Sequence, residues 1–204
     1  QPLPRLATHP CARVLHARAW MRGEAWEGLR PDDTTLHAGT LNWSYTLGVG
    51  LMDPWCAGAH AVLCAGGVEP AEWPGIIERL GVTVFAAVPT VYRQLLKYGR
   101  PEDADLRALR HGLCAGEALP PSVAAEWRER VGRPLYESLG ITEVSTYISA
   151  GPGVPVREGS PGRPQPGRRV AVLAEDVEAG DTPLSAGEPG LLAVHRSDPG
   201  LMLG

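Results

Sequence analysis

The sequence lacks an uninterrupted apolar run of the ~20 residues that a membrane-spanning helix needs, and no basic-then-apolar segment near its start indicates a secretory signal. It also lacks an excess of basic charge, since 19 Lys and Arg stand against 23 Asp and Glu and give a net charge of −4 at pH 7. Such a balance does not indicate a nucleic-acid or anionic-membrane partner. We therefore expect neither, and a homo-oligomer is compatible with the sequence.

Metal-binding spacings are absent as well. The four cysteines, at positions 11, 56, 64 and 114, and the six scattered histidines form no pattern of the kind that holds zinc. Cys64 and Cys114 lie inside apolar runs, where a buried and unreactive thiol is the usual state. We therefore expect reduced structural cysteines and a cytoplasmic location.

The composition is that of an ordinary soluble globular protein, with 44% hydrophobic and 21% charged residues in a length of 204. Such a length allows one substantial domain or two small ones. Helical and strand-like segments alternate up to residue 139, which predicts an α/β fold with a mostly parallel sheet flanked by helices. We expect helices over 14–29, over 44–59 with a break or kink at Pro54, over 70–80, from Pro89 onward and over 120–131, and strands over 61–64, 82–88, 112–115 and 135–139.

The chain changes character after residue 148. From 149 to 190 it is rich in Gly and Pro, and strands expected over 169–174 and 191–195, with a turn between them at 187–190, predict antiparallel β structure. We therefore expect an α/β subdomain over 1–148 and a smaller β-rich subdomain over 149–204. The start is Pro-rich and aperiodic and the end is apolar and uncapped, so the sequence is interpreted as a fragment of a longer protein, truncated at its end.

The most informative segment is Ser-Leu-Gly-Ile-Thr-Glu at 138–143, which follows an expected strand. Gly140 allows the backbone to turn tightly and to approach a ligand closely. Thr142 can donate a hydrogen bond to a phosphate oxygen, and Glu143 offers the hard oxygen ligand that Mg²⁺ prefers. The pair suits nucleotide chemistry, and the alternative is a turn or a helix start with a capping threonine.

A second turn of this kind is Ala-Gly-Glu-Ala-Leu-Pro at 115–120, between an expected strand and an expected helix. In an open α/β sheet, ligands bind outside the carboxyl ends of the strands. Two ligand-competent turns are therefore expected at the same edge of the sheet, one strand apart. Two purely structural turns are the alternative.

Five segments, in the right order, resemble motifs of the adenylate-forming superfamily, which comprises acyl- and aryl-CoA ligases, the adenylation domains of peptide synthetases, and luciferases. They are a strand-Pro-Thr-helix segment at 85–92, the Ala-Gly-Glu-x-Leu adenine loop within 112–120, the Tyr-Gly-x-Thr-Glu motif at 139–143, the Gly-Ser-x-Gly-x-Pro-x-Pro-Gly segment at 159–167 and the Gly-Glu-x-Gly-Glu-Leu turn at 187–192. The chain is identified as a member that resembles part of the large N-terminal domain.

Within the superfamily the sequence is similar to the CoA ligases of short-chain, medium-chain and aromatic acids such as benzoate. Residues 40–48 and 53–55 carry this similarity, whereas long-chain ligases and peptide-synthetase domains usually have a Phe-His pair near Trp43. Leu139 departs from the tyrosine that many members place there to stack on adenine. Aryl-CoA ligases share this departure, and an aliphatic side chain can also cover the face of a base.

The resemblance implies a role for each matching residue. Thr142 would bind the α-phosphate of ATP and Glu143 the magnesium ion, which makes these two the expected catalytic residues. The nucleotide would also be bound by Gly116, Glu117, Ala118, Ser138, Leu139, Gly140 and Ile141, and the acyl pocket would be near Trp43, Val88 and Pro89. Trp43 could alternatively be an aromatic residue of the core. Glu117 could alternatively be a loop or cap residue.

The implied reaction has two steps and uses ATP, Mg²⁺ and CoA with a small carboxylic acid, short-chain, medium-chain or aromatic. The acid carboxylate attacks the α-phosphorus, pyrophosphate leaves, and the thiol of CoA captures the acyl-adenylate. In the first step the protein mainly positions the reactants and stabilises charge on the phosphates.

Parts of the superfamily's site have no counterpart in this sequence. Its Ser/Thr/Gly-rich phosphate loop would lie just before Val14, where residues 6–13 contain neither serine nor glycine. The ribose-binding Asp and the small C-terminal domain with its catalytic Lys would follow Gly204. We therefore expect an inactive fragment of an acid–CoA ligase. The alternatives are an adenylation domain that loads a carrier-protein thiol and a non-catalytic remnant that serves as a binding or interaction module.

Overall fold

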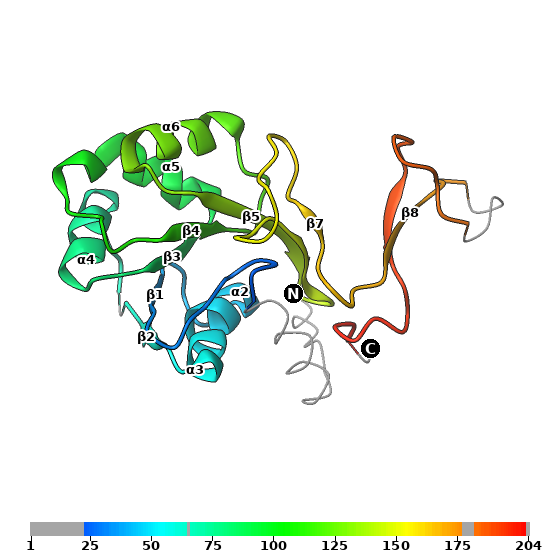
Figure 1. Ribbon diagram of the computed structural model, residues 1–204, viewed down its shortest axis with the longest axis horizontal. Coiled ribbons are helices and arrows are strands. Elements are labelled where there is room, and N and C mark those ends of the chain that lie inside the picture. Colours follow the sequence, from blue (N-terminus) through cyan, green and yellow to red (C-terminus); the bar gives the residue numbers. More distant parts are fainter. Residues whose placement is uncertain (1–22, 65, 177–181, 203–204) are drawn as a thin grey trace, which may run out of the picture.

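The computed structural model describes residues 23–64, 66–176 and 182–202 (Figure 1). Its helical elements are α2 (Ser44–Leu47), a π-helical segment (Gly48–Met52), α3 (Asp53–Ala57), α4 (Trp73–Arg79), α5 (Pro89–Tyr98) and α6 (Pro121–Val131), with short 3-10 turns at Pro70–Glu72 and Pro101–Asp103. Its strands are β1 (Thr34–His37), β2 (His60–Val62), β3 (Val84–Ala87), β4 (His111–Cys114), β5 (Leu135–Ile141), β6 (Ser145–Ser149), β7 (Arg163–Pro164), β8 (Val170–Leu173) and β9 (Leu191–Val194). No helix of this described part is long and apolar enough to cross a membrane.

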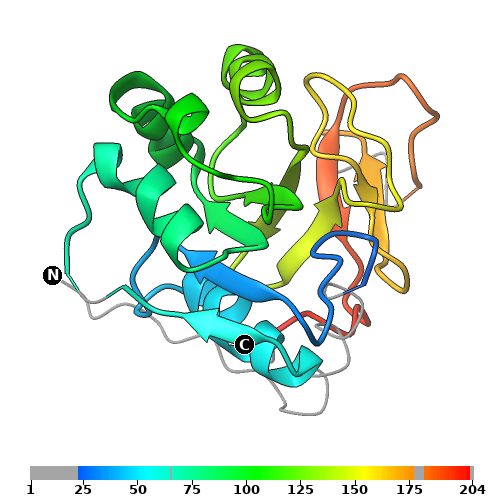
Figure 2. The same cartoon turned by 60° about the vertical axis from the view of Figure 1, so that its left-hand side comes forward.

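A seven-stranded sheet in the order β2-β1-β3-β4-β5-β6-β7 forms the centre of the fold. The pairs from β2 to β5 are parallel, and β6 and β7 add antiparallel pairs at one edge. Strands β8 and β9 form a separate antiparallel hairpin beside that edge (Figure 2). The predicted fold class, a mostly parallel α/β sheet followed by a smaller antiparallel portion, is confirmed.

Helices cover both faces of the sheet, because the side chains of β3 alternate between two apolar clusters. Phe85 packs with Tyr92 of α5 and Trp127 of α6 in a fully buried cluster, and the rings of Tyr92 and Trp127 meet edge to face at 4.9 Å. Val84 belongs to the cluster on the opposite face, with Val49 of the π-helical segment. Accordingly, α4, α5 and α6 lie on one side of the sheet in Figure 1, and α2 and α3 lie on the other.

Three elements differ from the sequence expectation. Strand β1 was not predicted, because its residues Thr-Thr-Leu-His include only one apolar side chain, although three of the four are buried between β2 and β3. Helical structure continues through Pro54 to Ala57, and its irregularity is the π-helical segment that comes just before this proline. The expected helix 14–29 is wrong in its described part, since residues 23–27 form turns and Gly28 takes a left-handed backbone with φ of 57°. Residues 14–22 lie outside the described part.

The expected boundary between two subdomains, at residues 148 and 149, falls inside β6. This strand pairs with β5 on one side and β7 on the other, so the main sheet extends past the boundary. The hairpin β8–β9 packs against the same strand through a third apolar cluster, in which Val170 and Val194 contact Val144, Tyr147 and Ile148. The division into 1–148 and 149–204 stays a prediction.

Candidate active site

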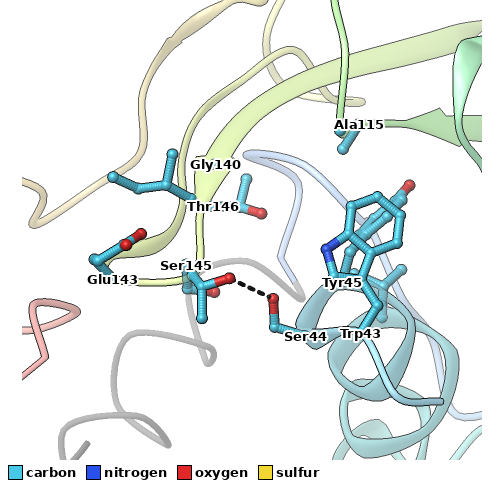
Figure 3. Close-up of a pocket in the computed structure, with 12 residues that line it drawn as sticks. Trp43, Ser44, Tyr45, Ala115, Gly140, Glu143, Ser145 and Thr146 are labelled. Atoms are coloured by element: carbon cyan, nitrogen blue, oxygen red, sulfur yellow. Dashed lines mark hydrogen bonds between the residues drawn. The ribbon is translucent and has the colours of Figure 1, made fainter. Parts of the chain in front are cut away.

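A cavity of about 330 Å³ opens at the carboxyl ends of β4 and β5. Its lining comes from three regions of the sequence: α2 with the π-helical segment that follows it, the loop after β4, and the turn between β5 and β6 with the ends of both strands (Figure 3). The lining residues are Trp43, Ser44, Tyr45, Val49, Ala115, Gly116, Gly140, Ile141, Thr142, Glu143, Ser145 and Thr146. The two turns that the sequence placed at one edge of the sheet therefore meet at one cavity.

The structure brings half of the predicted site residues to this cavity. Those that line it are Trp43, Gly116, Gly140, Ile141, Thr142 and Glu143, and those that do not are Val88, Pro89, Glu117, Ala118, Ser138 and Leu139. The sequence did not indicate Ser44, Tyr45, Val49, Ala115, Ser145 or Thr146 as site residues. Most of these belong to α2, the π-helical segment and β6, whose approach to the cavity depends on tertiary packing.

The turn that carries Thr142 and Glu143 spans residues 142–144 and leaves both side chains exposed. The Oγ1 atom of Thr142 lies 3.3 Å from Oγ of Ser44, and the dashed line in Figure 3 marks this hydrogen bond. Ser145, directly after the turn, has φ of 64°, the only positive φ among the described residues other than glycine. The turn is therefore tightly bent, and α2 touches it from the opposite side of the cavity.

A shift in strand register explains why neighbouring residues of β5 point to different places. The pairing of β5 with β6 shifts between Leu139 and Gly140, as in a β-bulge, so that Gly140 and Ile141 both line the cavity. Ser138, with 3% of its surface exposed, is buried before the shift. Leu139 instead packs against the cluster of Val144, Tyr147 and Ile148.

Aromatic side chains form the wall opposite the turn. The ring centroids of Trp43 and Tyr45 are 5.4 Å apart in an edge-to-face arrangement, and Tyr45 is also stacked on Trp26. Trp43 is 38% exposed and lines the cavity, whereas Trp26 is fully buried beneath it. Burial raises the pKa of Tyr45 well above its usual value, so its hydroxyl stays neutral. The wall offers a largely uncharged surface.

Gly116 lies in contact with this aromatic wall. A Cβ atom at this position would lie 2.6 Å from Cη2 of Trp43 and 3.3 Å from Cγ1 of Val88. The residue also takes φ of 97°, which side chains rarely adopt. Val88 therefore supports the loop at Gly116 without lining the cavity.

The other residues of the predicted adenine loop contribute structure. Glu117 accepts hydrogen bonds from the backbone N–H and the hydroxyl of Thr90, at 3.1 and 2.8 Å, and so caps the first turn of α5. Glu137, which the sequence did not single out, accepts a 2.9 Å hydrogen bond from the backbone N–H of Leu119 and fastens the loop to β5. Burial raises the pKa of Glu137.

Among the described lining residues Glu143 is the one charged side chain, and none is Lys or Arg. No group of three or more His, Cys, Asp or Glu side chains in the described part of the chain is placed to hold a metal ion. A single exposed carboxylate fits a magnesium ion that fills most of its shell with water and phosphate oxygens. The cavity thus combines one metal-competent carboxylate, hydroxyl donors and an aromatic wall.

Comparisons with known proteins point in one direction. Residues 3–204 match the sequence profile of the AMP-binding enzyme family. The benzoate–CoA ligase of Thauera aromatica is 35% identical over 186 residues, which cover 91% of this chain and 35% of that protein. The 3-hydroxybenzoate–CoA ligase of Aromatoleum sp. (strain CIB) is 29% identical over 192 residues, 94% of this chain and 36% of that protein.

Solved structures agree with these relatives. The anthranilate CoA ligase AuaEII, in complex with anthranoyl-AMP, superposes with a TM-score of 0.82 at 30% identity, over 94% of this chain and 36% of that one. An acyl-CoA synthetase of Brucella canis gives a TM-score of 0.83 at 36% identity, over 94% of this chain and 35% of that one. The chain thus spans about a third of the length of the proteins it matches.

Proposed function

The chain belongs to the AMP-binding enzyme family, and on that premise we propose that it forms part of an ATP-dependent acid–CoA ligase. One observation carries the proposal: the Thr142–Glu143 turn and the loop at Gly116, separated in the sequence by α6 and β5, line one cavity at the carboxyl edge of the sheet. Such an edge is where ligands bind in open α/β folds. Relatives named as CoA ligases support the same activity.

We propose a separate task for each of the two walls. On the turn, the Thr142 hydroxyl would donate to an α-phosphate oxygen as the acid carboxylate attacks phosphorus, and Glu143 would hold the magnesium ion. A magnesium ion bound at Glu143 would neutralise part of the negative charge on the phosphates. The bond from phosphorus to pyrophosphate breaks as the acyl–phosphate bond forms, and the thiol of CoA then displaces AMP from the acyl-adenylate. In both displacements the protein positions the reactants, and its fixed dipoles stabilise the charge that develops.

The aromatic wall favours an aromatic acid as the substrate. Trp43, Tyr45 and Val49 present an apolar surface opposite the turn, and ring faces and edges pack well against another ring. Relatives and solved neighbours with names that specify benzoate, 3-hydroxybenzoate and anthranilate support this choice. We therefore propose a small aromatic carboxylic acid rather than a long acyl chain.

The test is single-turnover adenylation by the full-length protein, meaning the complete reading frame to which these residues belong. With benzoate as the probe, wild type should release pyrophosphate and form a CoA thioester. Glu143→Gln should slow pyrophosphate release far more than it weakens ATP binding, with partial recovery at high magnesium, because the amide keeps the shape and loses the anionic ligand.

The control variant is Glu129→Gln, which removes an exposed carboxylate on α6, outside the cavity, and should leave both rates unchanged. An unchanged adenylation rate in Glu143→Gln, with only a raised dissociation constant for ATP, would show that Glu143 is not the metal ligand. Adenylate formation without any CoA thioester would instead favour a domain that loads a carrier-protein thiol. Absence of pyrophosphate release from wild type with every acid offered would favour a non-catalytic binding module.

A further inference from the structure

A buried ion pair lies directly behind the Thr142–Glu143 turn. Nη1 of Arg168 is 2.6 Å from Oδ1 of Asp198, and neither side chain has any exposed surface. Arg168 comes just before β8 and Asp198 shortly after β9, so the pair closes the base of the β8–β9 hairpin. Neither residue belongs to the motifs that carry the family resemblance, and neither lines the cavity.

Arg168 is hydrogen-bonded to backbone around the turn, and Asp198 to backbone beside the pair. Nη2 of Arg168 donates to the carbonyl oxygens of Val144, at 2.8 Å, and Thr146. Asp198 accepts from the backbone N–H groups of Arg169 and Gly200, both at 2.8 Å. The planar fork of a guanidinium can serve a carboxylate and two carbonyls together, which a lysine ammonium cannot match in geometry.

The bonded carbonyls flank the most tightly bent residue of the site. Val144 and Thr146 stand on either side of Ser145, whose φ of 64° is a conformation that persists when the surroundings hold it. On the other side of the turn, the backbone N–H of Met202, beyond Asp198, donates to the carbonyl of Glu143 at 2.8 Å. Arg168 and Met202 therefore hydrogen-bond to the backbone of residues 143–146, and Asp198 binds the guanidinium of Arg168.

Stability alone is a weak reason for this arrangement, because a buried ion pair replaced by apolar residues often leaves stability unchanged or higher. We propose that Arg168 and Asp198 are positioning residues, which fix the backbone of the turn so that Thr142 and Glu143 face the reacting phosphate. The inference rests on the proposed function, because it assigns the ion pair to adenylation at that site.

The decisive variant is the double substitution Arg168→Met with Asp198→Asn in the full-length protein. It removes both charges and the donors to the turn while leaving no unpaired buried charge, and the amide oxygen can still accept from one of the two backbone N–H groups that Asp198 binds. We expect melting within a few degrees of wild type, adenylation slower by roughly tenfold or more, and a KM for the acid that changes little. Amide hydrogen exchange over 142–146 should become faster.

Two further variants complete the design. Arg168→Lys keeps the buried charge paired but loses the planar fork of the guanidinium. Its adenylation rate and its amide exchange over 142–146 should therefore lie between those of wild type and the double variant. If the double variant does not fold, Arg168→Lys tests the proposal in its place. Arg169→Met is the matched control, because this exposed neighbour donates through its guanidinium to Ser197 and not to the turn. It should behave as wild type in each assay.

The outcomes separate the two proposals. A folded double variant with wild-type adenylation, or with wild-type exchange over 142–146, overturns the positioning role. If wild type itself forms no adenylate, the proposed function fails, and the exchange measurement still decides whether the pair holds the turn.

Discussion

At the scale of single residues, Gly116 shows how closely the site is packed. Its φ of 97° and a prospective Cβ at 2.6 Å from Trp43 leave no room for alanine. We expect Gly116→Ala to cost about 1–3 kcal/mol in unfolding free energy from backbone strain and to push Trp43 into the cavity, which lowers adenylation. Gly132→Ala is the control, since Gly132 has a similar φ of 70° with nothing within 4 Å. Urea unfolding should then show strain in both variants, with lost activity only for Gly116→Ala; equal activities would contradict this.

Thr142 tests the same site from its polar side. Its side chain is exposed, so Thr142→Ala should melt within a few degrees of wild type, yet adenylation should fall roughly ten- to a hundredfold, as expected for one hydrogen bond to a charged group. Thr142→Ser keeps the donor and should keep most activity. Ser122→Ala removes an exposed hydroxyl on α6, outside the cavity, and serves as the control. Strong destabilisation of Thr142→Ala with normal turnover of its folded fraction would assign the hydroxyl a structural role.

The sequence predicted those cavity residues whose own chemistry points to a ligand. Thr142, Glu143 and Gly116 stand in turns after strands, and both turns reach the cavity. Tyr45 and Thr146 could not be found in this way, because a tyrosine in a helix and a threonine in a strand have the same local pattern in any core. Ser138 and Leu139 do not line the cavity, because they precede the register shift in β5, which only the pairing with β6 reveals.

At the scale of elements, prediction succeeded where local composition and burial agree. The β-branched, largely apolar segment 82–88 contains β3, and the pattern around Trp127 predicts α6. Strand β1 was not predicted, because Thr35 and His37 are buried by the position of the strand between β2 and β3 and not by its composition. A polar strand in the middle of a sheet has no local signal.

Helix α5 provides an element-scale prediction, because the carboxylate that caps it comes from another loop. Glu117→Ala should lower the unfolding free energy by about 0.5–2 kcal/mol, since Thr90 loses an acceptor for its N–H and its hydroxyl, while the dissociation constant of ATP stays nearly unchanged. Glu117→Gln keeps one acceptor oxygen and should recover most of the loss. Chemical denaturation and ATP titration of both variants provide the measurement. A large fall in adenylation without loss of stability would instead make Glu117 a participant in the chemistry.

At the scale of the whole molecule, two buried histidines make stability depend on pH. Burial lowers the pKa of His37 to about 3 and that of His111 to about 4, against 6.5 for an ordinary histidine. The unfolded chain therefore binds more protons below pH 6.5, and the unfolding free energy falls as the pH drops, by roughly 2 kcal/mol per histidine at pH 5. Burial raises the pKa of Glu137, so the folded protein binds this proton more tightly than the unfolded chain does. This carboxyl therefore makes the unfolding free energy rise as the pH drops toward its pKa.

Urea unfolding of the chain at pH 7.5 and pH 5.0 measures this loss. His37→Gln removes one of the two titrations and should roughly halve the difference between the two values of pH. His60→Gln, at an exposed position on β2, should leave the difference as it is in wild type. Equal stability of wild type at both pH values would show that the two rings are not held neutral by the fold.

The arrangement of the whole sheet was predicted only in outline. Alternating segments gave a parallel α/β sheet, but the order β2-β1-β3-β4-β5 depends on crossovers that no local pattern encodes. The extension of that sheet by β6 and β7 was also not anticipated, because β6 directly follows the turn at 142–144 and the two-residue β7 lies within the Gly- and Pro-rich segment after residue 148.

The final prediction concerns the activity of the 204 residues by themselves. None of the described residues that line the cavity is Lys or Arg, and the chain spans about a third of the length of its relatives. Phosphate charge would then be stabilised by Thr142, backbone N–H groups and the ion held by Glu143. Each missing charge-assisted hydrogen bond is worth about 1.5–3 kcal/mol, and a factor of ten in rate corresponds to about 1.4 kcal/mol. The absence of several such hydrogen bonds to the phosphates would lower the rate of adenylation by many orders of magnitude.

We therefore expect the purified 204-residue chain to bind an acyl-adenylate analogue weakly and to show no pyrophosphate exchange above background, in an assay where the full-length protein is active. Steady production of acyl-CoA by the 204-residue chain would prove this wrong and would mean that the described cavity is sufficient for catalysis.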